Sequence, residues 1–148
     1  MAYDITFALS LFNRDLDADE SLEALNILAG ALQQIDMGYL RRHPQTPELY
    51  SSGVRYQEER PGQERWQDIP QVLQRGVGDC EDLSAWRAAE LNIRSGISAR
   101  AEVAVSKVYP DGRRLYHVFV RLPDGTIEDP SRILGMQSTS NISLVSRR

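Results

Sequence analysis

The chain of 148 residues contains one cysteine, Cys80, and one lysine, Lys107. A single cysteine cannot form an internal disulfide, which excludes a small secreted fold held together by disulfides. No stretch approaches the roughly 18 consecutive apolar residues of a transmembrane helix. Paired-cysteine metal motifs and the third glycine of a phosphate-binding loop are also missing. We therefore predict no metal, no cofactor and no membrane partner.

The composition is that of a globular protein, with 41% hydrophobic and 26% charged residues. The length suits one domain with its own core. A net charge of −4 argues against a nucleic-acid partner, because nucleic-acid binders are usually basic. The first residues lack the basic region of a signal peptide, so the expected location is the cytoplasm, with a virus particle as the alternative.

Two long helices are predicted from apolar residues that recur at the helical period. The first runs from about residue 19 to 42 and is closed by Pro44. The second runs from Cys80 to Arg94, with Asp79 as N-cap and Gly96 after its last turn. A short helix at 71–75 precedes it, and the polar segment 43–65 is expected to be a loop pinned by its tyrosines.

The pattern changes to strands after the second long helix. Strands are expected at Ala99–Tyr109, Leu115–Leu122 and Thr126–Asp129. Pro-Asp-Gly turns separate them, which predicts an antiparallel meander. The expected fold class is therefore α+β, a single domain with an N-terminal helix, a core at about 66–136 and a mobile serine-rich tail at 137–148. The apolar segment Ile5–Phe12 is expected to be a short strand or an irregular lead-in.

The only thiol lies at the first turn of the second long helix. A helix N-terminus favours a thiolate, because its dipole and unpaired backbone N–H groups lower the pKa of the thiol. Those N–H groups could also hold an oxyanion. The carboxylates of Asp79, Glu81 and Asp82 oppose the thiolate. A nucleophilic Cys80 therefore needs a general base nearby.

His117 is the candidate base because it lies inside an apolar strand, where an idle polar ring would be costly. Across the turn at Asp124-Gly125, strand pairing sets His117 near residues 128–130. Asp129 then comes within reach of the imidazole and could hold its tautomer. The other histidine, His43, is expected to be a solvated loop residue.

Three short motifs occur in the order Gly-Asp-Cys at 78–80, His-Val-Phe-Val at 117–120 and Glu-Asp-Pro-Ser at 128–131. This arrangement resembles the transglutaminase-like domain of the papain-like cysteine protease superfamily, over about residues 66–136. The form Gly-Asp-Cys-Glu-Asp-Leu is similar to small members encoded by phages and prophages.

The resemblance implies a papain-like core with a catalytic triad of Cys80, His117 and Asp129. It implies acyl transfer on a peptide or protein amide through a thioester, as in a thiol protease, another hydrolase or a transglutaminase. The family uses a residue upstream of the cysteine to complete the oxyanion hole. The candidates here are Trp66, Gln67 and Gln74.

A non-catalytic function is the alternative. A lone cysteine is usually a small buried apolar residue, and Asp129 before a proline is a common strand-end turn residue. The chain would then be a structural or adaptor protein on the same fold, for example a phage particle component with an assembly partner. Trp86 is expected to belong to the core in either case.

Overall fold

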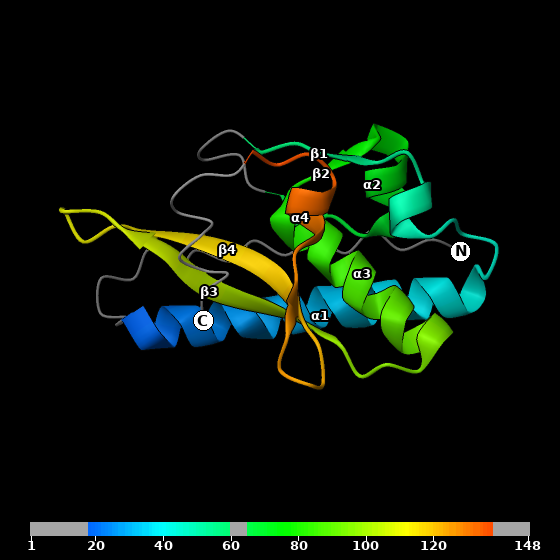
Figure 1. Cartoon of the computed structure of the whole chain (residues 1–148), viewed down its shortest axis with the longest axis horizontal. Helices are drawn as coiled ribbons and strands as arrows, with labels where there is room; N and C mark the ends of the chain where they lie inside the picture. Colours follow the sequence, from blue (N-terminus) through cyan, green and yellow to red (C-terminus); the bar gives the residue numbers. More distant parts are fainter. Residues whose placement is uncertain (1–17, 60–64, 138–148) are drawn as a thin grey trace.

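A computed structural model describes residues 18–59 and 65–137 (Figure 1). The expectations for Ile5–Phe12 and for the serine-rich tail from Ser138 lie outside these residues. The described part is a mixed α+β structure of four α-helices, one 3₁₀ helix and two small sheets. Within it, no helix combines the length and the apolar character needed to cross a membrane.

The first long helix, α1, spans Ala18–Arg42, and its prediction is confirmed. Acidic residues stand in its first turn and Arg41 and Arg42 in its last, which suits the helix dipole. Its inward face buries Ala29, Leu32 and Leu40. In Figure 1, α1 runs along one edge of the molecule, packed against α3 and β3.

The second long helix, α3, spans Cys80–Ser95, as the sequence predicts. Asp79 caps its N-terminus, and Gly96 ends it with a positive φ of 65°. Leu83, Trp86 and Ala89 are fully buried along one face, which confirms Trp86 as a core residue. The helix also packs against β3 and β4 of the main sheet.

The predicted antiparallel meander is present as the sheet β3-β4-β5. Its strands are β3 (Arg100–Val108), β4 (Arg114–Arg121) and β5 (Ile127–Glu128). The register pairs Ala104 with His117 and Val120 with Glu128. The third strand ends one residue before Asp129, so that residue lies just beyond the ladder.

The polar segment between α1 and α3 contains more structure than the predicted loop. It holds a 3₁₀ helix, η1 (Leu49–Ser51), and β1 (Arg55–Tyr56), which pairs in parallel with β2 (Val77–Gly78). The short helix α2 (Ile69–Arg75) begins two residues earlier than predicted, because Asp68 caps it and Pro70 fits its first turn. A further helix, α4 (Pro130–Ile133), follows β5. Strands of two residues have no periodicity for a sequence pattern to detect.

Candidate active site

Cys80 is the first residue of α3, behind the glycine-rich turn that ends α2. Gly76 takes a positive φ of 75°, and Gly78 is buried so closely that an added Cβ would lie 3.0 Å from Leu83 Cδ2. The main chain therefore turns directly into the helix at Asp79. The cysteine itself is half-buried, among residues that include Trp66, Tyr116 and Val118.

The environment of the thiol is acidic. Cys80 Sγ donates a hydrogen bond to Glu81 Oε2 at 3.4 Å. Burial raises the pKa of the Cys80 thiol well above its ordinary value, and the charges of Glu81 and Asp79 raise it further. A backbone hydrogen bond from Val118 acts in the opposite direction. The carboxylates oppose the thiolate as the sequence indicated, and together with desolvation they outweigh the effect of the helix N-terminus.

His117 and Asp129 are brought together as predicted. His117 Nε2 lies 2.8 Å from Asp129 Oδ2, and the two side chains are only 7% and 15% exposed. An ionised carboxylate can only accept, so Nε2 carries the proton in this pair. The other ring nitrogen, Nδ1, is then unprotonated in the neutral imidazole and has the form of a general base.

The strand register differs slightly from the expected one. Continuing the β4–β5 ladder past Val120 and Glu128 sets Asp129 beside Phe119, diagonal to His117. Asp129 is the N-cap of α4, yet its side chain makes no capping hydrogen bond. Its Oδ2 is used on His117 instead, and its buried Oδ1 has no partner among the described residues. The carboxylate is thus committed to the imidazole.

The start of α3 lies against β4 next to His117. Ser84, one helical turn after Cys80, donates a hydrogen bond to the carbonyl oxygen of Val118 at 3.0 Å. The Cys80 sulfur interacts with the backbone of the same residue. The three predicted triad residues therefore belong to one region of the fold. Among the described residues, no hydrogen bond joins Sγ to the His117 ring.

The predicted oxyanion site is only partly available. The backbone N–H of Cys80 donates to Asp79 Oδ1 at 2.7 Å, so the cap occupies a donor that an oxyanion would need. Trp66 packs in the same cluster as Cys80, which keeps its indole N–H as a candidate donor. Gln67 is buried, and its Oε1 has no partner within the part of the chain that is described. Gln74 is exposed on α2.

The carboxylate of Asp82 fixes the backbone segments that lead into α3. Asp82 is fully buried and accepts from the backbone N–H groups of Gln67 at 2.7 Å and Asp79 at 3.0 Å. Burial raises the pKa of Asp82 to about 7, against the effect of these two hydrogen bonds. Glu81 is also buried, and desolvation followed by the charge of Asp82 raises its pKa. These acids are therefore structural parts of the helix start as well as neighbours of the thiol.

Within the described ranges, one group of side chains has ligand atoms close enough together to hold a metal ion. Ligand atoms of Asp79, Cys80 and Glu81 all lie within 4.8 Å of one another. Asp79 already accepts from the backbone N–H groups of Cys80 and Glu59, which accounts for its position without a metal.

One polar network near the site was not predicted from the sequence. Glu128, next to Asp129, accepts from Tyr50 Oη at 2.6 Å and from Arg87 Nε at 2.5 Å. Arg87 also binds Glu90, which in turn accepts from the backbone N–H of Leu49. The network ties α3 and the polar segment 43–65 to β5, the strand that directly precedes Asp129. Only its tyrosine was foreseen as an anchor.

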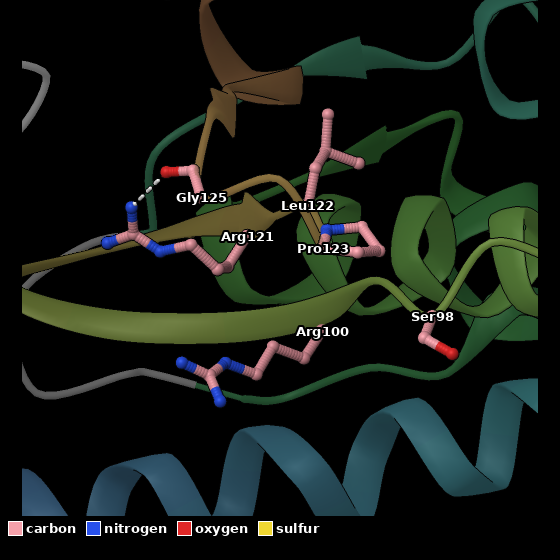
Figure 2. A pocket seen from close by; sticks show the side chains of 6 residues that line it. All are labelled: Ser98, Arg100, Arg121, Leu122, Pro123 and Gly125. Carbon is pink, nitrogen blue, oxygen red and sulfur yellow. Dashed lines mark hydrogen bonds between the residues drawn. The ribbon is translucent and has the colours of Figure 1, made fainter.

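A pocket of about 270 Å³ lies away from these residues, between the start of β3 and the β4–β5 turn (Figure 2). Arg100 and Arg121 line it, and both bind Glu102. Arg121 also donates to the carbonyl oxygen of Gly125 at 2.8 Å. None of the predicted site residues lines this pocket.

His43 differs from its prediction as a solvated loop residue. It is half-buried, and its ring stacks on Tyr39 with the centroids 4.3 Å apart. It lies just after the end of α1, and among the described residues it has no hydrogen bond to His117 or Asp129.

No protein-family model, no curated protein and no solved structure matches this chain.

Proposed function

We propose that this chain is a cysteine-dependent acyl-transfer enzyme acting on peptide or protein amides, with a transglutaminase-like, papain-like core. The observation that supports it most is the pair of buried His117 and half-buried Asp129, with Nε2 and Oδ2 2.8 Å apart, beside the helix that begins with Cys80. A buried carboxylate on one nitrogen of an imidazole orients the other nitrogen toward a nucleophile. The order of cysteine on a helix start, histidine on a strand and aspartate after the next strand agrees with the family it resembles.

In the proposed reaction, His117 Nδ1 takes the proton from Cys80 Sγ as the sulfur attacks the carbonyl carbon of the amide. The new S–C bond forms, and the carbonyl oxygen becomes an oxyanion. The C–N bond then breaks, and the amine leaves with the proton from His117. Water attacks the thioester, gives a proton to His117 and releases the acid, which restores the thiol. An amine in place of water would give transamidation.

The raised pKa of the thiol defines how this site would work. At neutral pH the thiol stays protonated in the resting protein, so His117 must accept its proton during attack rather than hold a preformed ion pair. The Cys80 N–H is bound to Asp79, so the oxyanion would rely on Trp66 or on release of that cap.

The test measures acylation of Cys80 by p-nitrophenyl acetate near neutral pH. Because Cys80 is the only cysteine, mass spectrometry of the acetylated peptide assigns the thioester without ambiguity. His117→Ala should slow acylation by at least about tenfold, since general-base catalysis contributes this much or more. His43→Ala is the matched control, because it removes the only other histidine and leaves the His117–Asp129 pair intact.

A non-catalytic structural or adaptor function is the second candidate. The observation in its favour is that Sγ hydrogen-bonds Glu81 and that the Cys80 N–H is taken by Asp79. Equal and slow acylation of the wild type and His117→Ala, with both proteins folded, would reject the enzyme proposal in favour of this one.

A further inference from the structure

The outward face of α1 is unusual for a helix that faces water. From Ala24 to Leu40 the only charged residue is Asp36, and it is fully buried. The exposed positions in this stretch are Ile27, Ala31, Gln34 and Ile35, which we call the α1 stripe. The two isoleucines are 67% and 51% exposed. An exposed helix face normally carries charged and polar residues. About five turns without an exposed charge therefore indicate that another protein surface packs on this face.

Two glycines beside the stripe are not required by close packing within the described part of the chain. A Cβ added at Gly30 would meet no atom within 4 Å, and one at Gly38 would meet only the guanidinium of Arg42, at 3.4 Å. Glycine inside a helix costs about 1 kcal/mol relative to alanine. Absent side chains on an open face allow another backbone to approach closely. The glycines therefore favour a second helix as the covering element.

The charges at the two ends of α1 identify which helix fits. Asp19 and Glu20 stand in the first turn, and Arg41 and Arg42 stand in the last. A second copy of α1 laid antiparallel would bring acids against arginines at both ends of the contact. A parallel copy would bring like charges together at each end. A two-fold axis at Ala31 sets Ile27 opposite Ile35 of the second copy, and Glu20 opposite its Arg42.

We propose that the α1 stripe is the contact face of a homodimer in which α1 packs antiparallel against α1 of a second copy, with Ala31 at the two-fold axis. The contact is isologous, because both copies use the same face: Ile27 of the first copy contacts Ile35 of the second, and Ile35 of the first contacts Ile27 of the second. It extends over about 33 Å of helix from Glu20 to Arg42. A single helix pair belongs to the small end of specific interfaces, so we expect a dissociation constant of roughly micromolar order.

Disulfide trapping tests this geometry in a Cys80→Ser background, which has no other cysteine. Ala31→Cys should form a covalent dimer on mild oxidation at about 100 µM protein, because packed helices at the axis bring the two Cα atoms within disulfide range. Ile27→Cys alone should not, since its two copies would be about 12 Å apart along the helices. Mixing Ile27→Cys with Ile35→Cys should give the heterotypic dimer.

Three results would overturn the proposal. The first is that Ala31→Cys cross-links no better than Glu48→Cys, an exposed position off the stripe. The second is that Ile27→Cys cross-links with itself, which would mean parallel pairing. Sedimentation velocity of the unmodified chain should show a dimer that Ile27→Glu abolishes and Gln45→Glu retains, with both variants folded by circular dichroism. A monomer at every concentration up to about 500 µM would also refute it.

Discussion

The buried carboxyl group of Asp36 should make the free energy of unfolding depend on pH. This carboxyl group lies fully buried in the C-terminal half of α1, where Oδ1 accepts from the backbone N–H of Ile69 at 2.9 Å. Its Oδ2 has no partner among the described residues. Burial raises the pKa of Asp36 well above its usual value of 3.8, and the charges of Asp68 and Asp82 raise it further. The Ile69 N–H opposes this and does not cancel it.

The consequence for stability has a definite sign. The unfolded chain releases this proton near pH 4, whereas the folded protein keeps it to higher pH, so the free energy of unfolding falls as pH rises between the two pKa values. The slope contributed by one such group is at most about 1.4 kcal/mol per pH unit. Over three pH units this slope bounds the effect, relative to an amide of the same shape, at about 4 kcal/mol.

Asp36→Asn removes this cost while keeping the oxygen that accepts from Ile69. The difference in the free energy of unfolding between the variant and the wild type should therefore shift in favour of the variant as pH rises. The shift is bounded at about 4 kcal/mol between about pH 4.5 and 7.5. Any packing cost of the amide is independent of pH and cancels in that difference. Urea unfolding followed by the fluorescence of Trp66 and Trp86 measures both free energies.

Glu48→Gln is the control for this experiment, because Glu48 is exposed to water and its replacement should have the same effect at both pH values. If the effect of Asp36→Asn also changes by less than about 0.5 kcal/mol across this range, the argument from burial is wrong.

Three further outcomes are expected. Asp129→Asn should slow acylation of Cys80 roughly 10–100-fold, because His117 loses a charge-assisted hydrogen bond; an unchanged rate would remove Asp129 from the site. Glu81→Gln should speed alkylation of the thiol by iodoacetamide near pH 7 by roughly threefold to tenfold, since removing a negative charge 3.4 Å from Sγ lowers the pKa of the thiol; a slower reaction would contradict this. Tyr50→Phe should lower the free energy of unfolding by about 1 kcal/mol through loss of its hydrogen bond to Glu128, as judged by urea unfolding.

The elements that sequence patterns predicted well are those specified by local signals. The periodic apolar residues of α1, the Asp79 cap and Gly96 stop of α3, and the two Pro-Asp-Gly turns of the meander each act within a few residues. Their boundaries agree with the structure to within one or two residues. The β1–β2 pair joins residues 55–56 to residues 77–78 and has no such signal. It forms because the tertiary structure brings the segment 43–65 against the turn that precedes α3.

The candidate site shows the same division. The pairing of His117 with Asp129 was predictable, because hairpin geometry relates residues on either side of a short turn. The environment of Cys80 was not. The sequence placed a helix N-terminus and opposing carboxylates beside the thiol, but it did not indicate the burial that raises the pKa of this thiol most. Side-chain burial depends on residues from several elements at once.

By itself, the sequence determined where the two long helices and the strands of the main sheet begin and end. It also determined which residue stands first on α3, and that an aspartate follows the third strand within reach of a histidine. Only the tertiary structure decided which carboxyl groups are buried, that Asp79 occupies the N–H of Cys80, and that the isoleucines of α1 face outward. The physical reason is range. Capping, turns and periodicity act between neighbours along the chain, whereas desolvation and exposure are set by everything that packs around a group.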